Sequence, residues 1–211
     1  MTETHAHAHE PVATVEFVAG WLALDFANTT SDRTGDTPHE RLHGYDDLLT
    51  WCVRAELFGK TEAARLRRLA AARPDEAAAV FARARALREA IWAIFDAFAR
   101  GREPAAGDVA LLNGVLTEGM GRRQLRPSAH GFCWAWAAEP DGLDWMLWPL
   151  AYSAAELLTS SELDRVKECG GETCDWLFVD VSRNRSRRWC DMKDCGNRAK
   201  ARRHYRRSKA G

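Results

Sequence analysis

The chain has 211 residues, of which 46% are hydrophobic and 28% are charged, and its formal net charge at pH 7 is zero. This length suits one globular domain with a small satellite and excludes two large domains. Because no apolar run approaches the roughly 20 residues of a membrane span and the first residues lack the features of a secretory signal, we expect a soluble, intracellular protein with no membrane partner.

The zero net charge conceals two oppositely charged parts. Residues 183–211 contain 12 Lys or Arg and two acidic residues, Asp191 and Asp194. The residues before them carry 18 basic and 28 acidic side chains. Parts of opposite charge indicate partners of different kinds.

The N-terminal segment has two sections. Residues 1–14 lack hydrophobic periodicity and are predicted to form a disordered tail, whose alternating His5, His7 and His9 would bind a metal ion only adventitiously. In the apolar section that follows, the alternation of Leu22, Leu24 and Phe26 fits a strand, but the length also allows a short buried helix.

Helices are predicted where apolar residues recur at intervals of three and four. The longest begins at Pro74, a residue favoured in a first helical turn, and stops at Gly101. The predicted ranges are 44–58, 61–72, 74–100 and 105–116.

The hydrophobic period then changes to two, which predicts a small antiparallel meander. Strands over 122–127 and 131–138 precede a Pro-Asp-Gly turn at 139–142, so residues 143–148 should return as a third strand. Pro149 should begin a last helix. We therefore predict a mainly helical α+β domain with a small antiparallel β-meander over residues 15–160.

Asp25 and Asn28 are the candidate ligand-binding residues of this domain. A carboxylate inside an apolar run needs a partner, and nearby tryptophans favour a small-molecule pocket, although the same residues could cap and fill a core. The sequence contains no nucleophile elbow, phosphate loop or metal-hydrolase motif. We therefore expect no enzymatic activity and assign no catalytic residue.

Four cysteines near the C-terminus form two close pairs, Cys169 with Cys174 and Cys190 with Cys195. Such pairs can converge as four thiolates around one tetrahedral zinc ion, and four sulfur ligands leave no open position, which makes the ion structural. An iron–sulfur cluster is the competing interpretation. The other two cysteines, Cys52 and Cys133, are expected to be buried.

The segments around the paired cysteines favour a treble-clef finger over residues 161–211. Residues 176–180 should form a strand that turns at 182–184 and returns through an arginine-rich segment. The residues after Cys195 have high helix propensity, so the last ligand should lie at the start of a basic C-terminal helix.

These segments resemble a known family. Residues 178–207, FVDVSRNRSRRWCDMKDCGNRAKARRHYRR, are similar to the CGNR zinc finger, named for the tetrad at 195–198. Upstream, GWLALDFANT and GYDDLLTWC resemble the opening of the ABATE domain, which precedes that finger in bacterial stress-induced transcription regulators. The resemblance implies a stress-responsive, DNA-binding regulator with an N-terminal sensor domain, located in the cytoplasm at the bacterial nucleoid.

The basic residues of the finger independently indicate a nucleic-acid partner. Arginine suits bidentate contacts to phosphate or guanine, and no acidic residue follows Asp194. Duplex DNA is preferred over RNA, because no row of aromatic residues interleaves the arginines. We assign base reading to the face of Arg198 and Arg202. The candidate DNA-binding residues are Arg183, Arg185, Arg187, Arg188, Arg198, Lys200, Arg202, Arg203 and Arg206.

Two further expectations concern partners. One finger with a short helix makes few contacts, so a homodimer is plausible. A zinc-stabilised module that binds protein or RNA is the alternative to a DNA-binding regulator. The inducing small molecule, if there is one, has no signature in the sequence.

Overall fold

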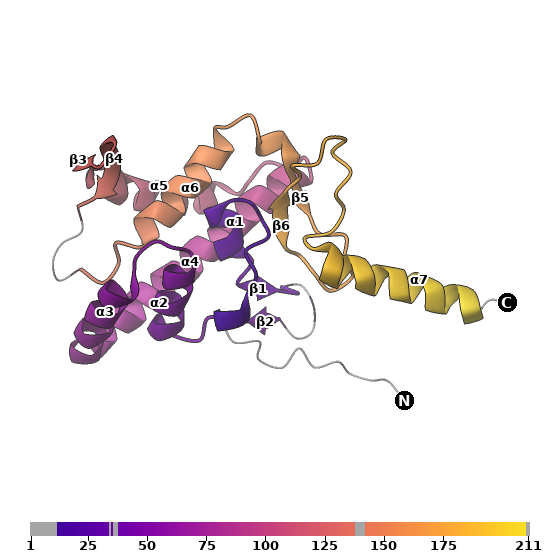
Figure 1. Ribbon diagram of the computed structural model, residues 1–211, viewed down its shortest axis with the longest axis horizontal. Coiled ribbons are helices and arrows are strands. Elements are labelled where there is room, and N and C mark those ends of the chain that lie inside the picture. Colours follow the sequence, from indigo (N-terminus) through magenta and orange to yellow (C-terminus); the bar gives the residue numbers. More distant parts are fainter. Residues whose placement is uncertain (1–11, 34, 36–37, 138–141, 210–211) are drawn as a thin grey trace.

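The centre of the fold is α4 (Pro74–Ala99), a 26-residue helix. The computed structural model describes residues 12–33, 35, 38–137 and 142–209, and Figure 1 shows α4 running through the middle of the molecule. Pro74 in the first turn and the two acidic residues beside it favour the start of this helix. The predicted range is confirmed to within one residue at its end.

Further helices pack around α4 and against one another. The segment around Leu24, for which the sequence allowed a strand or a helix, forms a helix, α1 (Leu22–Ala27), in which five of six residues are buried. A helix buried on nearly every side shows no amphipathic period, which explains why the pattern was ambiguous. These helices are α1 (Leu22–Ala27), α2 (Tyr45–Arg54), α3 (Lys60–Ala72), α5 (Ala106–Met120) and α6 (Leu147–Leu158). Within the described ranges, no helix combines the length and apolar character needed to cross a membrane.

An antiparallel hairpin of β3 (Arg123–Ser128) and β4 (Gly131–Trp136) projects from the helical body (Figure 1). The predicted third strand over 143–148 is wrong. Leu143, Met146 and Leu147 are buried at intervals of three and four, and this segment turns into α6. Of the predicted turn at 139–142, residues 139–141 lie outside the described residues.

Two smaller expectations also need correction. The predicted tail extends too far, because Val12–Thr14 form a short 3-10 helix, η1, in which Val12 is buried and its carbonyl accepts a hydrogen bond from Arg54 (2.8 Å). The earlier part of the tail, with its three histidines, lies outside the described residues. Cys133 is exposed on the projecting hairpin, whereas Cys52 is buried as expected.

The C-terminal part forms a second hairpin and a helix. Strand β6 (Leu177–Val179) pairs antiparallel with the preceding strand β5 (Val166–Glu168), with Lys167 opposite Phe178. The prediction that the arginine-rich segment after β6 forms its return strand is therefore wrong. The α+β class with a finger and a basic C-terminal helix is confirmed. These elements are β5 (Val166–Glu168), β6 (Leu177–Val179), the π-helical turn η3 (Met192–Gly196) and α7 (Asn197–Lys209).

Strand β6 also attaches the C-terminal part to the helical body. Its Val179 N–H donates to the carbonyl of Ala19 (2.9 Å), and the side chain of Asn28 pairs with both backbone groups of Leu177. Side chains from both parts belong to one hydrophobic core, in which Phe178 is fully buried. A short strand pair obtains from this packing the stability that it lacks in isolation. A two-stranded sheet of β1 (Thr30–Ser31) and β2 (His39–Glu40) lies nearby.

Candidate metal centre and nucleic-acid interface

The four paired cysteines converge at one point. Cys169 and Cys174 lie in the connection between β5 and β6, while Cys190 and Cys195 lie just before η3 and within it. All four Sγ atoms lie within 4.8 Å of one another. One ligand pair in a hairpin turn and the other at the start of a helix is the treble-clef arrangement that the spacing predicts.

The sulfur positions fit a tetrahedral metal ion. A tetrahedron with metal–sulfur bonds of about 2.3 Å has sulfur–sulfur edges of about 3.8 Å. The Sγ atoms of Cys174 and Cys190 lie 3.8 Å apart, and those of Cys190 and Cys195 lie 3.7 Å apart. Four thiolates would complete the coordination of such an ion, so the centre has a structural rather than a catalytic design.

Small residues let the chain close around the sulfurs. A Cβ atom at Gly171 would lie 3.0 Å from the Cβ of Cys174, and one at Gly196 would lie 2.7 Å from the sulfur of Met192. The side chain of Asp191 caps η3 by accepting a hydrogen bond from the N–H of Lys193 (2.8 Å). Gly171 therefore allows the chain to close at the first ligand pair, while Gly196 and Asp191 shape the second.

Asp180 organises the loop between β6 and Cys190. Its fully buried carboxylate accepts hydrogen bonds from Lys167 Nζ (2.6 Å), from Ser182 and from the N–H of Arg187 (3.0 Å). Burial acts to raise the pKa of Asp180, but these donors outweigh it and hold the pKa below its ordinary value. The carboxylate is therefore a fixed anchor of the arginine-rich loop.

Arg187, a candidate DNA contact, turns into the protein. Its guanidinium donates to the carbonyls of Val18 (2.9 Å), Trp189 (3.0 Å) and Cys190, and it lies 4.3 Å from the ring centre of Phe178. These contacts join the segment of a metal ligand to the N-terminal part of the chain. The structure therefore gives Arg187 an internal structural role.

The other three candidates of this loop are exposed. The guanidinium of Arg185 pairs with Asp164 at 2.7 Å, and that of Arg188 lies 5.5 Å from the ring centre of Trp189. Arg183 lies at the tip of the loop. This loop therefore presents three basic side chains at the surface beside the metal centre.

Helix α7 presents its basic residues on two faces. On the face turned toward the finger, Arg198 Nη2 lies 3.0 Å from the sulfur of Cys195 and 2.8 Å from Asp194. One and two turns later, Arg202 and Arg206 pair with Glu172 at 2.7 and 3.2 Å. The face that we assigned to base reading is thus already engaged with acidic and thiol groups of the finger.

Lys200, Arg203 and Arg207 lie on an adjacent side of α7, and all three are exposed. No carboxylate pairs with these three side chains within the described residues. Arg203 and Arg207 also line a groove of about 420 Å³ between α7 and the Cys169–Cys174 connection, together with Arg202, Arg206 and Glu172. A row of arginines along one groove provides a geometry suited to a phosphate backbone.

Asp25 and Asn28 both have partners inside the protein. Asp25 Oδ1 accepts a hydrogen bond from the N–H of Ala19 (3.0 Å), and burial raises the pKa of this carboxyl to about 6. Asn28 donates to the carbonyl of Leu177 (2.8 Å) and accepts from its N–H (2.9 Å). These contacts give both residues a structural role, and the predicted small-molecule pocket gains no support from them.

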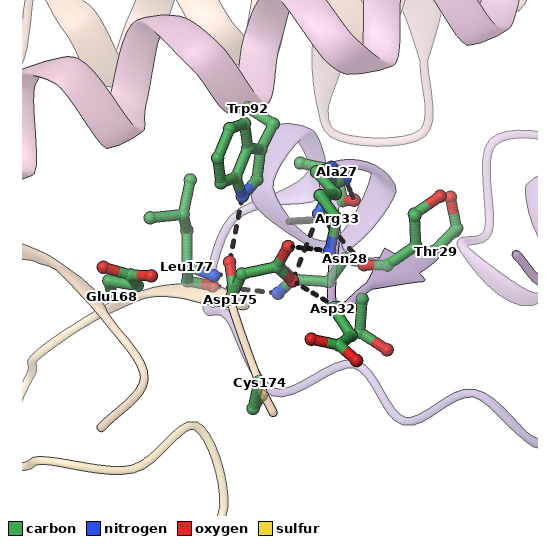
Figure 2. A network of polar contacts seen from close by, with 12 residues as sticks. Ala27, Asn28, Thr29, Asp32, Arg33, Trp92, Glu168, Cys174, Asp175 and Leu177 are labelled. Carbon is green, nitrogen blue, oxygen red and sulfur yellow. Dashed lines mark hydrogen bonds and ion pairs between the residues drawn. The ribbon is translucent and has the colours of Figure 1, made fainter. Parts of the chain in front are cut away.

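Asp175, which follows the ligand Cys174, joins the finger to the helical body, and the sequence analysis did not single it out. Figure 2 shows its carboxylate accepting from the N–H groups of Asp32 and Arg33, at 3.2 and 2.8 Å, and from the Arg33 guanidinium. Its carbonyl accepts from the indole of Trp92 (2.9 Å) on α4. An acidic residue between a cysteine ligand and an apolar strand is the only sequence signal of this role.

Two family models match the chain. The ABATE model, described as a putative stress-induced transcription regulator, matches residues 4–161. The CGNR zinc finger model matches residues 165–208, which include all four clustered cysteines. A comparison with curated proteins found no match.

Proposed function

The chain belongs to the ABATE family of stress-induced transcription regulators and carries a CGNR zinc finger, and on this premise we propose that it is a non-enzymatic, zinc-dependent regulator that binds duplex DNA. Zinc is the metal because four thiolates at tetrahedral spacing, framed by a hairpin and a helix, are the ligand set of structural zinc. One ion per chain holds the finger in shape.

The observation that carries the DNA proposal is the exposure of α7. None of its 13 residues is buried, it contains no acidic residue, and it extends away from the helical body (Figure 1). A rigid basic helix with no protein covering it is typical of a polyanion-binding element. We assign the first contacts to Lys200, Arg203 and Arg207, whose face is free of acidic partners among the described residues.

Arg202 and Arg206 would join the interface by exchanging Glu172 for a phosphate. Both ion pairs are exposed, and exposed pairs contribute little, so a DNA phosphate can replace the carboxylate. Arg198 positions the start of α7 through its contact with Cys195. The loop residues Arg183, Arg185 and Arg188 would contact the phosphate backbone of the flanking DNA. Base reading then falls to Lys200, Arg203 and Arg207 rather than to Arg198 and Arg202.

Titration of the zinc-loaded full-length protein with mixed-sequence duplex DNA across a salt series tests this proposal. If about five phosphates are neutralised, log affinity should fall with log salt at a slope of about −4.5. Arg203→Ala and Arg207→Ala should each reduce the slope by about one, and Glu172→Gln should raise affinity by releasing two arginines.

Arg68→Ala is the matched control, because it removes an exposed arginine from the acidic part of the chain. It should leave both the affinity and the slope unchanged. Retention of duplex DNA that is absent or indifferent to salt would contradict the proposal. It would favour the alternative of a zinc-stabilised module that binds protein, and tighter binding of single-stranded RNA would favour an RNA partner.

The N-terminal domain is the proposed sensor, with an inducer of unknown chemistry. The contacts of Asp175 with Arg33 and Trp92 supply a rigid connection through which that domain would influence the finger. The protein would act in the cytoplasm at the nucleoid, where its DNA partner lies.

A further inference from the structure

A cavity of about 300 Å³ lies where the finger meets the N-terminal part of the chain. Its walls come from three segments that are far apart in the sequence: residues 14–18, the β1–β2 sheet and the metal centre. The residues that matter here are Thr14, Glu16 and His39 on one side and Cys174, Cys190 and Cys195 on the other. Three of the four proposed metal ligands thus line one cavity.

The four sulfurs differ in their surroundings. Cys169 Sγ accepts a hydrogen bond from the N–H of Cys190 (3.3 Å), and Cys195 Sγ accepts one from Arg198 (3.0 Å). Among the described residues, no N–H group donates to the sulfur of Cys174 or Cys190. Cys174 is also the one half-buried ligand, whereas the other three are buried. Hydrogen bonds withdraw electron density from sulfur, so Cys174 and Cys190 are the more nucleophilic pair.

We propose that Cys174 and Cys190 are an oxidation site through which a hydroperoxide switches off the finger. This inference rests on the zinc centre proposed above. The sulfur of Cys174 attacks one peroxide oxygen, the O–O bond breaks, and a sulfenic acid and hydroxide form. The sulfur of Cys190, 3.8 Å away, then attacks the sulfenic sulfur and displaces a second hydroxide.

With hydrogen peroxide as the oxidant, electrons and atoms are balanced in the overall reaction. Two thiolates lose two electrons and form one S–S bond, and the peroxide accepts these electrons and leaves as two waters after taking two protons from solvent. The disulfide removes two of the four metal ligands. An ion held by the two remaining thiolates is bound far more weakly, so the metal dissociates.

Loss of the metal would affect both α7 and the attachment of the finger to the helical body. Cys190 precedes η3, from which α7 begins, so the DNA-binding helix would lose its anchor. Cys174 precedes Asp175, and Figure 2 shows both residues beside the network of Arg33 and Trp92 that joins the finger to the body. Oxidation at one cavity would therefore alter both the finger and its attachment.

To test this proposal, the zinc-loaded full-length Cys133→Ser variant is treated with hydrogen peroxide. This substitution removes the exposed thiol outside the site. Zinc release is followed with a metal indicator, and disulfides are mapped by mass spectrometry of peptides. We expect one zinc per chain to be released and the first disulfide to join Cys174 with Cys190. Loss of duplex DNA binding should accompany release, and reductant with zinc should restore it.

Access through the cavity is tested by two matched substitutions in one short helix. Thr14→Trp adds bulk to the cavity wall and should slow zinc release at least about threefold, since oxidation follows exposure of the thiolate. Ala13→Trp adds the same side chain at an exposed position outside the wall and should leave the rate unchanged.

A first disulfide between any other pair, or equal release rates in the two tryptophan variants, would overturn the oxidation site. The zinc content is measured before peroxide is added, so that failure of the oxidation proposal can be distinguished from failure of the proposed function. Protein that contains no zinc at that point would overturn the proposed metal centre itself.

Discussion

At the scale of the residue, burial decides which charged groups are structural. Arg187 makes its contacts inside the protein, and Asp180 fixes a loop. Arg203 and Arg207 of α7, by contrast, form no ion pair with an acidic residue within the described residues. Burial also raises the pKa of the Asp25 carboxyl from 3.8 to about 6, so ionised Asp25 is expected to cost stability.

Asp25→Asn should therefore stabilise the protein in a pH-dependent way. A folded-state pKa above the unfolded value means that ionised Asp25 costs stability above about pH 6 and costs nothing below about pH 4. Asparagine keeps an oxygen to accept from Ala19 but carries no charge. The free energy of unfolding of the variant minus that of the parent should rise between these pH values, by at most about 3 kcal/mol.

Urea unfolding of both proteins at several pH values measures this difference directly. A difference that does not change between about pH 4 and 7 would show that the pKa of Asp25 in the folded protein is not raised above its unfolded value. Taking the difference between the two proteins cancels the contributions of other groups, such as Glu40, whose ion pair with Arg88 lowers its pKa and acts in the opposite direction.

At the scale of the element, the short strands depend on their neighbours. Strands β5 and β6 have three residues each, and β6 is completed by the backbone of Ala19 and the side chain of Asn28. Helices α1, α4 and α6, by contrast, contact one another directly. The folding stability of the finger is therefore expected to depend on the metal ion, and that of the helical core is expected to depend on it much less.

Removal of the metal by a chelator should increase amide hydrogen exchange in β5, β6, η3 and α7, since metal-binding free energy is folding free energy in such small units. The amides of α4 should remain protected, because α4 also packs against α1, α2, α5 and α6, which lie outside the finger. Hydrogen exchange followed by mass spectrometry, with and without chelator, provides the measurement. Equal loss of protection in α4 would mean that the two parts unfold as one unit.

At the scale of the whole molecule, the projecting β3–β4 hairpin leaves an apolar face uncovered. Leu125 and Trp134 are directly opposite on one face and are 57% and 61% exposed, and Phe132 on the same face is 72% exposed. Isolated two-stranded hairpins are marginally stable in water, and a contiguous exposed apolar face marks an interaction site. We propose that a second copy of the chain covers this face, and such a dimer would double the contacts of the proposed DNA-binding helix.

Trp134→Ser should therefore shift the protein from dimer to monomer, because it removes the largest side chain of that face. Sedimentation velocity over a range of protein concentrations measures the change. Val181→Ser, which removes an exposed apolar side chain outside the hairpin, is the control and should leave the dimer intact. A parent protein that stays monomeric at all concentrations would contradict the prediction.

The sequence by itself determined the metal centre and most helices. Four cysteines within 27 residues carry their own chemistry, and their spacing restricts how they can converge. The long helices show an amphipathic period because one face of each is buried and the other is solvated. Both signals are local, so they could be predicted without knowledge of the fold.

Only the tertiary structure decided which polar residues are available for function. Asn28 pairs with Leu177, 149 residues away, and Glu172 neutralises arginines 30 and 34 residues later. The segment 143–148 joins a helix because Leu147 packs in the core, which an alternating pattern does not predict. Contacts between residues that are distant in the chain produce no periodic pattern in the sequence. The burial and the partners of these side chains could therefore be known only from the tertiary structure.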